Sequence, residues 1–376
     1  MPSGLTADGQ SLTDGLEKEE ISQLLTLLAQ DAQVHHQLEP VKPDIIGEYL
    51  VLDYINQKSL SVKCKQFIAA CWEKRDEFLA FLSRCVRSYL RDFSGLIFGE
   101  HPILFAEADP WAQAIIMFGM TTLPDITFCQ KAINVLESLY NQYQEPSFAL
   151  VYASGLVNLS AKLDVNEAAE TIERLKSIVE QWPDNQAIAL VYASGLFNLS
   201  AKQEVNEAAE TIERLKSIAE QWPDNQAIAL EHASGLVNLS AKQDVNEAAE
   251  TIERLKSIVE QWPDNQAIAL VYASGLFNFS AKQDVNEAAE TIERLKSIAE
   301  HWPDNQEIAL RYALGLFNLS AKQDVNEAEK TIDKLKTFSD NWPNSQEIVQ
   351  VYTMAQFYFS RKQAIKNIIS YQSSRD

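Results

Sequence analysis

The sequence of 376 residues is poor in the side chains on which metal binding and nucleophilic catalysis depend, with 4 cysteines and 5 histidines. So few cysteines do not make a disulfide framework, and none stands at the short spacing that a zinc site needs. We therefore expect Cys64, Cys71, Cys85 and Cys129 to be buried, reduced thiols in a cytoplasmic protein. We expect no catalytic site, no metal site and no cofactor, and hence no enzyme.

Long apolar runs and an excess of positive charge are also missing. No stretch of about 18 apolar residues is present, so no transmembrane helix is predicted. The first 20 residues are polar and acidic, which is unlike a secretory signal. The chain has 32 Lys and Arg against 53 Asp and Glu, a net charge of −21. Nucleic acids and anionic membranes are bound by clustered basic residues, so we expect neither as a partner.

What the sequence does contain is a repeat of 40 residues. The segment Tyr-Ala-Ser-Gly-Leu at 152–156 recurs with small changes through 312–316, and His232 stands where the other copies have tyrosine. A Trp-Pro pair stands near the end of each 40-residue repeat. The five repeats are 145–184, 185–224, 225–264, 265–304 and 305–344. A fixed period in this range is typical of a solenoid, and paired substitutions that alternate between repeats indicate the duplication of an 80-residue block.

Two helices are predicted in each repeat. The second has apolar residues three and four positions apart, which form one helical face; in the second repeat they are Val205, Ala208, Ile212, Leu215, Ala219 and Trp222. Asp164 and Asp244 precede this helix with glutamate three residues later, a capping pattern, whereas Glu204 is a poorer N-cap. Proline ends the helix, and we expect Asp184 to cap the helix that follows.

The first helix of the second repeat, predicted over 186–202, is apolar on nearly every side and should be buried between its neighbours. Serine, asparagine and lysine four residues apart interrupt it, and stacked repeats would align them along one surface. We call this surface the polar stripe. It includes the position whose charge varies most between near-identical repeats, occupied by Val151, Val191, Glu231, Val271 and Arg311.

The polar stripe is the candidate partner-binding surface, because asparagine amides can pair with the backbone of a bound peptide. The candidate residues are Ser154, Asn158, Lys162, Ser194, Asn198, Lys202, Glu231, Ser234, Asn238, Lys242, Ser274, Asn278, Lys282, Arg311, Asn318 and Lys322. A second explanation accounts for the stripe equally well, since any solenoid needs polar residues to keep its inner face wet. The acidic excess of the repeats is interpreted as a solvated outer face rather than a groove for a basic partner.

The repeats resemble a known family. The Tyr-Ala-x-Gly-Leu helix, the Asn-Glu-Ala that opens the second helix and the closing Trp-Pro-Asp-Asn are similar to tetratricopeptide repeats. Those repeats are helix–turn–helix units of about 34 residues, so the helices here are longer by nearly a turn each. The resemblance implies an all-α, right-handed solenoid whose concave groove binds peptides or proteins.

The flanking regions complete the expected domain plan. Residues 1–20 are expected to be a flexible N-terminus and residues 21–106 an N-terminal helical segment. Residues 107–144 have the pattern of a degenerate repeat, and the five clear repeats occupy 145–344. Residues 345–376 are interpreted as a pair of C-terminal capping helices, which an array needs because a bare apolar end would otherwise be exposed.

Within the N-terminal segment, helices are predicted at 21–29, from Pro43 to Ile55 and over 60–93. Residues 43–48, Pro-Asp-Ile-Ile-Gly-Glu, resemble a stretch of bacterial STAND-type signalling NTPases that joins the winged-helix end of the NTPase to its sensor repeats. The chain has no Gly-x-x-x-x-Gly-Lys-Ser/Thr loop. The resemblance therefore implies the sensor part of such a system, with an NTPase module as a partner.

The function predicted from the sequence is non-catalytic recognition of a protein or peptide along the repeat surface. By resemblance, the repeats would detect an invader-derived protein, such as a phage component, in an antiphage defence system. The alternative is a stand-alone adaptor that bridges cellular proteins. Residues 20–60 discriminate between the two: a winged-helix remnant leading into the array favours the sensor, and a free capping helix pair favours the adaptor.

Overall fold

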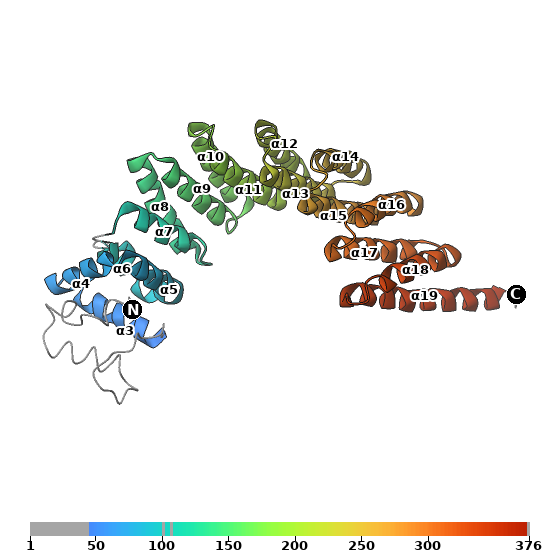
Figure 1. The fold of residues 1–376 in the computed structure, drawn as a ribbon, viewed down its shortest axis with the longest axis horizontal. Helices are drawn as coiled ribbons and strands as arrows, with labels where there is room; N and C mark the ends of the chain where they lie inside the picture. The colour runs from blue at the N-terminus through green and yellow to red at the C-terminus, as the bar shows by residue number, and fades with distance from the viewer. Residues whose placement is uncertain (1–44, 100–101, 106–107, 374–376) are drawn as a thin grey trace, which may run out of the picture. The chain divides into compact units, whose positions relative to one another are not determined.

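A computed structural model of the protein describes residues 45–99, 102–105 and 108–373 (Figure 1). Over these ranges the protein is all-α, with 17 α-helices, one short 3₁₀ helix and no strand. The predicted flexible N-terminus at 1–20, the predicted helix at 21–29 and Pro43 lie outside the described residues. The fold is an all-α solenoid, as the 40-residue repeat predicts.

The chain divides into two compact units. The N-terminal unit comprises Met1–Leu163 and Glu173–Ile188, and the C-terminal unit comprises Asp164–Ile172 and Ala189–Asp376. The first helices of the chain all belong to the N-terminal unit. They are α3 (Ile45–Lys58), α4 (Val62–Glu73), α5 (Arg75–Phe93), α6 (Gly95–Phe98), η2 (Ile103–Phe105), α7 (Pro110–Thr121), α8 (Ile126–Tyr143) and α9 (Pro146–Ser160).

The N-terminal segment folds as a small helical cluster. Helix α3, which includes the described part of residues 20–60, packs on α5, and Ile55 of α3 is fully buried. Arg84 of α5 donates to the Glu48 carboxylate of α3 at 2.7 Å, and the glutamate side chain is nearly buried. Helices α7 and α8 then form a pair, and both of them pack on α9. Residues 108–144 thus have the helix–turn–helix form expected of a degenerate repeat.

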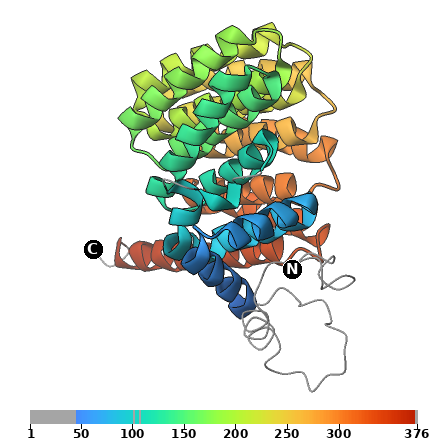
Figure 2. The same cartoon turned by 90° about the vertical axis from the view of Figure 1, so that its left-hand side faces the viewer.

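The remaining helices follow the repeat. They are α10 (Val165–Gln181), α11 (Gln186–Lys202), α12 (Val205–Gln221), α13 (Gln226–Lys242), α14 (Val245–Gln261), α15 (Gln266–Lys282), α16 (Val285–His301), α17 (Gln306–Lys322), α18 (Val325–Asp340) and α19 (Gln346–Ser373). The helix predicted over 186–202 is confirmed as α11. Figure 2 shows the succession of helix pairs from a second direction.

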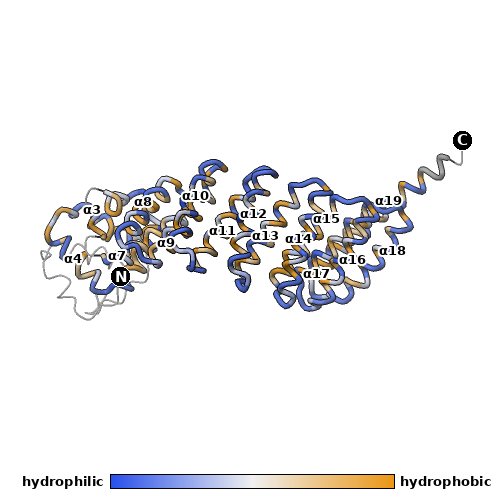
Figure 3. The backbone as a smooth tube through the Cα atoms, turned by 90° about the horizontal axis from the view of Figure 1, so that it is seen from above, coloured by the Kyte–Doolittle hydropathy of each residue, from blue (hydrophilic) through white to orange (hydrophobic). Residues whose placement is uncertain are grey.

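In the C-terminal unit the first helices α13, α15, α17 and α19 pack on one another in direct succession. Each second helix packs on the first helix of its own repeat and on that of the next, as α14 does on α13 and α15. Contacts between neighbours only, repeated along the chain, define a solenoid. Figure 3 shows apolar and polar residues alternating along these helices, as burial of one helical face requires.

A glycine within α13, α15 and α17 allows this close packing. A Cβ atom built on Gly235 would lie 2.4 Å from Cδ1 of Ile212 on the preceding second helix, and one on Gly315 would lie 2.5 Å from Cδ1 of Ile292. Glycine in a helix interior costs about 1 kcal/mol relative to alanine. This cost is offset because glycine, which has no Cβ, leaves room for the isoleucine side chain of the preceding second helix to pack against the backbone.

The capping predictions are confirmed for the second helices and wrong for the first helices. The Asp244 carboxylate accepts from the backbone N–H groups two and three residues on, at 2.8 and 3.0 Å, whereas Glu204 makes no such bond. Asp184 was expected to cap α11, but the side chain of Asn185 does so, accepting from two N–H groups at 3.1 Å. Because α11 begins at Gln186, Asn185 is the residue directly before it and Asp184 lies one position too early.

The prediction of a C-terminal helix pair is also wrong, because α19 is one continuous helix of 28 residues. In the fifth repeat Asp324 separates two helices by capping the second of them. The corresponding residue in α19 is Ala364, which has no oxygen to cap with, and α19 contains no proline or glycine. Nothing in the sequence therefore ends the helix at this point.

Helix α19 differs from the other first helices in which side chains it buries. Thr353 and Gln356 are exposed, where the fifth repeat buries Ala313 and Leu316 at the corresponding positions. The same helix also exposes Phe357, Tyr358, Ile365 and Ile368, so polar and large apolar side chains are mixed on its exposed side. In the part of the chain that the structure describes, no helix combines the length and the hydropathy needed to cross a bilayer.

A recurring set of polar contacts joins the helices of neighbouring repeats, and we call it the Tyr–Arg–Glu network. An arginine of the second helix donates to the tyrosine hydroxyl of the first helix and pairs with a glutamate of the preceding repeat. The hydroxyl bonds are Arg174–Tyr152 at 2.7 Å, Arg214–Tyr192 at 2.5 Å and Arg294–Tyr272 at 2.5 Å. The ion pairs are Arg174–Glu137 at 3.2 Å, Arg254–Glu213 at 2.6 Å and Arg294–Glu253 at 2.9 Å.

Candidate functional site

The polar stripe lies on the first helix of each repeat, between the buried and the exposed sides. In α13 the variable position Glu231 and the stripe residues Ser234 and Asn238 are half-buried. The buried side of the same helix consists of Ile228, Ala229, His232, Ala233, Gly235, Leu236, Leu239 and Ser240. Because α13, α15 and α17 pack side by side, the stripe continues from repeat to repeat.

The lysines of the stripe have a structural role that the sequence analysis missed. The Lys242 ammonium donates to the carbonyl oxygens of Ser200, Ala201 and Gln203 at the end of α11, the first two at 2.9 and 3.0 Å. Lys282 and Lys322 make the same three bonds one and two repeats further on. An ammonium has three N–H groups, so these lysines use all their donors to cap the preceding first helix, where a positive charge also complements the helix dipole.

The N-terminal unit shows a related arrangement around Thr121, the last residue of α7. The Asn158 amide donates to the Thr121 hydroxyl at 2.9 Å, and the Lys162 ammonium donates to the Thr121 carbonyl. Ser154 turns back on its own helix and donates to the carbonyl of Leu150 at 2.8 Å. Asn158 of α9 and Lys162, two residues past the end of α9, therefore serve the packing of α9 on α7, whereas Ser154 bonds within its own helix.

The asparagines of the later repeats differ, because their amides have no hydrogen-bond partner among the described residues. They are Asn198, Asn238, Asn278 and Asn318. Each is half-buried and stands on the face that the first helices share. A side-chain amide offers two donors and an acceptor, so this row of four amides can pair with the backbone of a bound polypeptide without breaking any bond within the chain.

The variable position places two lone charges on this face. Glu231 accepts a hydrogen bond from the Ser194 hydroxyl at 2.7 Å, and Arg311 donates through Nε to the Ser274 hydroxyl at 3.2 Å. Each charged side chain is thus held by the serine of the preceding repeat, while valine occupies the same position in the other repeats. The two opposite charges are two repeats apart, which at the usual spacing of packed helices is roughly 20 Å.

The residue types expected to be inert have the predicted environment. The four cysteines are buried and free, and burial raises the pKa of Cys71 and Cys85 to about 12, with the Glu48 carboxylate adding to the shift at Cys85. Thiols with such pKa values stay protonated and are poor nucleophiles at neutral pH. Over the described ranges, no cluster of three or more His, Cys, Asp or Glu side chains is placed to hold a metal ion.

Comparison with known proteins assigns no family: no protein-family model matches the chain, and neither does any curated protein. The candidate site is therefore argued from geometry. The structure divides the polar stripe into lysines that cap neighbouring helices, four asparagines with free amides, and two charged residues of opposite sign. Among the described residues, the four amides have no bond within the chain to give up, and each of the two charged side chains is held by one serine.

Proposed function

We propose that the protein is a non-catalytic recognition scaffold, similar to tetratricopeptide-repeat proteins, that binds a protein or peptide along the polar stripe. The observation that supports this proposal is the row of four asparagine amides that have no partner among the described residues. They lie on α13, α15 and α17, which pack in succession, and on α11, which bonds to α13 through Ser194 and Glu231. A half-buried amide without a partner loses part of its hydration and gains nothing in return. A bound backbone supplies the missing hydrogen bonds.

The two lone charges define which polypeptide fits. Glu231 attracts a basic group and Arg311 an acidic one, and the two recognised groups would lie roughly 20 Å apart. That span corresponds to about 6 residues of extended chain or about 13 residues of helix. Valine at the same position in the other repeats adds apolar contact between and beside the charges.

We further propose that the scaffold is the sensor part of a bacterial STAND-type signalling or antiphage defence system, acting with an NTPase module. This proposal is supported by the resemblance of residues 43–48 to the segment that precedes the sensor repeats in such proteins. A sensor must recognise a protein that is absent from the resting cell. A stand-alone adaptor must bind partners that are always present.

The test is a pull-down with the tagged chain from bacterial lysate, prepared with and without phage infection, at low and high salt. A single partner present only after infection and retained at high salt supports the sensor. Host partners present in both lysates support the adaptor instead. Binding that disappears at high salt indicates attraction to the acidic surface and contradicts both readings.

The site itself is tested by replacing Glu231 or Arg311 with valine, the residue that the other repeats have at this position. We expect Glu231→Val and Arg311→Val each to weaken binding of the captured partner by about tenfold, because each removes one charge-assisted contact of about 1.4 kcal/mol. Neither change should unfold the array, since valine is the residue found in three other repeats. Glu250→Gln, at an exposed position of α14, is the matched control. Equal binding by all three variants would place the contact elsewhere.

A further inference from the structure

A cavity of about 680 Å³ lies between the fourth and fifth repeats, with α16 on one side and α17 and α18 on the other. Aromatic and acidic side chains form much of its wall: Glu293, Glu300, Asp304, Tyr312, Phe338 and Trp342. Lys296 and Lys334 also line it. None of these residues belongs to the polar stripe, so the cavity is a separate feature from the proposed recognition surface.

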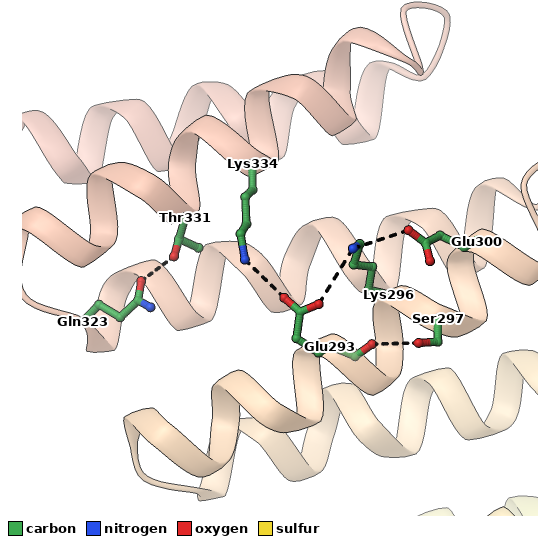
Figure 4. A network of polar contacts seen from close by, with 7 residues as sticks. All are labelled: Glu293, Lys296, Ser297, Glu300, Gln323, Thr331 and Lys334. Atoms are coloured by element: carbon green, nitrogen blue, oxygen red, sulfur yellow. Dashed lines mark hydrogen bonds and ion pairs between the residues drawn. The ribbon is translucent and has the colours of Figure 1, made fainter.

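The Tyr–Arg–Glu network is incomplete at this cavity. Lys334 stands at the position that is arginine in the four preceding repeats. Its ammonium pairs with the Glu293 carboxylate at 3.2 Å, and Figure 4 shows the side chain extended from α18 toward that residue. A guanidinium can bond a tyrosine hydroxyl and a carboxylate together, whereas an ammonium on a flexible stem is a single compact charge. The tyrosine of this repeat is left without its usual partner.

Tyr312 is that tyrosine, and its side chain lines the cavity. The residue is 5% exposed, and its hydroxyl has no hydrogen-bond partner among the residues that the structure describes. In three other repeats the equivalent hydroxyl accepts from an arginine at 2.5 to 2.7 Å. A tyrosine hydroxyl usually has a partner when it is buried. The hydroxyl oxygen is not among the fully buried polar atoms, so a donor placed in the cavity can reach it.

We propose that this cavity binds a guanidinium group supplied from outside the chain. The protein itself shows how such a group is held, because Arg294 occupies the equivalent place in the fourth repeat. The Arg294 guanidinium donates to the Tyr272 hydroxyl, pairs with Glu253 at 2.9 Å and lies 5.8 Å from the centre of the Tyr272 ring. The external group would meet Tyr312 and Glu293 in the same arrangement.

The charges around the cavity favour a cation. The two lysine ammonium groups are already paired, Lys296 with Glu293 and Glu300 at 3.8 and 3.5 Å and Lys334 with Glu293. Asp304 has no ion-pair partner among the described residues. Burial, with the Glu293 and Glu300 carboxylates adding to the effect, raises the pKa of Tyr312 to about 12. The hydroxyl is thus neutral at physiological pH and lies in a negative potential.

Two further features suit a guanidinium rather than an ammonium. Phe338 replaces the isoleucine of the other repeats and packs edge-on against Tyr312, with ring centres 4.9 Å apart. A guanidinium stacks on aromatic faces and is more weakly hydrated than an ammonium. The Lys334–Glu293 pair is more than half exposed on both sides, and such pairs contribute little. An incoming guanidinium can therefore replace Lys334 at Glu293 with little loss.

The proposal is tested by NMR titration of the full chain with N-acetyl-L-arginine methylamide, which mimics an arginine within a polypeptide. N-acetyl-L-lysine methylamide is the matched cation. Free L-arginine is the third probe and distinguishes a small-molecule site from one for a protein side chain. We expect the blocked arginine to bind at one site, at least tenfold more tightly than the blocked lysine. Tighter binding of free L-arginine would identify the small molecule as the ligand. No saturable binding of either arginine probe, or equal binding of the blocked lysine, would overturn the proposal.

Two variants locate the site. Lys334→Arg should restore the network, fill the cavity from within and abolish probe binding, while the thermal midpoint stays at or above that of the wild type. Arg294→Lys should free Tyr272 and create a second site, which doubles the binding stoichiometry. Undiminished binding by Lys334→Arg would show that the probe binds elsewhere. Glu231→Val and Arg311→Val should leave probe binding unchanged, which separates this site from the polar stripe.

Discussion

At the scale of the residue, the array is most informative where one repeat departs from the others. His232 takes the place of the network tyrosine in the third repeat; it is 8% exposed, and its Nε2 atom has no partner. Burial, with the charges of Arg254 and Lys216 adding to it, lowers the pKa of His232 to about 4. Arg254 retains its ion pair with Glu213 and bonds no tyrosine hydroxyl among the described residues. The third repeat therefore carries a buried base that resists protonation.

This depressed pKa predicts a local sensitivity to acid. Above the ordinary histidine pKa of 6.5 the side chain is neutral in both the folded and the unfolded chain. As the pH falls from there toward 4, the unfolded chain binds a proton and the folded chain does not, so the free energy of unfolding decreases, by up to about 3 kcal/mol. The variant His232→Tyr should not show this decrease in the free energy of unfolding, and its hydroxyl should give Arg254 a hydrogen-bond partner.

The prediction is checked by urea unfolding of the wild type and His232→Tyr at pH 7 and pH 5. The advantage of the variant should be about 2 kcal/mol larger at pH 5 than at pH 7. His301→Tyr, at an exposed position of α16, is the control and should show no such difference. An equal advantage of His232→Tyr at both pH values would mean that the histidine does not titrate in the way its environment implies.

At the scale of the element, a lysine joins each of the first helices α13, α15, α17 and α19 to its predecessor. We expect Lys242→Met, which keeps the apolar stem and removes the ammonium, to destabilise the C-terminal unit by about 1 kcal/mol. The lost bonds reach the carbonyls of Ser200, Ala201 and Gln203. Hydrogen exchange at the end of α11 should become faster as well.

The matched control is Lys256→Met. Lys256 pairs with Glu260 at 3.6 Å on the surface of α14, and such a pair within one helix contributes a few tenths of a kcal/mol. Its removal should leave exchange in α11 unchanged. If both variants lose the same stability, the lysines of the stripe do not act as caps and remain available to a partner.

The elements themselves were largely predictable, and the contacts between them were not. The run of apolar residues on nearly every side predicted a helix over about 186–202, which agrees with α11, and Asp244 was identified as a cap from its neighbours in the chain. A lysine four residues after an asparagine, in contrast, has the same sequence pattern whether it binds a partner or caps a helix 40 residues earlier. The one available signal was its recurrence as Lys362, in a terminal helix where much else has changed.

The same limit applies to the candidate site. Tyrosine and arginine recur together in the repeats, but no local rule shows that their side chains meet across 22 residues. The sequence alone therefore gives no meaning to the two exceptions, His232 and Lys334. Once the structure brings the two positions together, each exception becomes the loss of one partner. The variable charges Glu231 and Arg311, which need only a comparison of aligned repeats, were identifiable from the start.

At the scale of the whole molecule, a solenoid should tolerate the loss of complete repeats, since its stability is a sum of repeat and interface terms. Deleting residues 225–304 joins Asp224 to Asn305 and reproduces the existing Asp304–Asn305 junction. We expect a shorter protein with unchanged helical content per residue and cooperative melting, measured by circular dichroism. The control deletion of 225–284 joins two second helices directly and should lose cooperative melting. Loss of cooperativity in the first deletion would contradict the solenoid.

Neighbouring interior repeats meet through the same contacts, and this affects how the number of repeats can change in evolution. The glycine that admits an isoleucine and the lysine that caps the preceding helix recur from one interior repeat to the next. Any interior copy can thus follow any other without a new interface. Unequal crossing-over between near-identical coding segments would produce variants that differ only in copy number. Inserted between Glu231 and Arg311, each additional copy would move the two charges apart by about 10 Å, so that ligand length could be matched without altering a single contact residue.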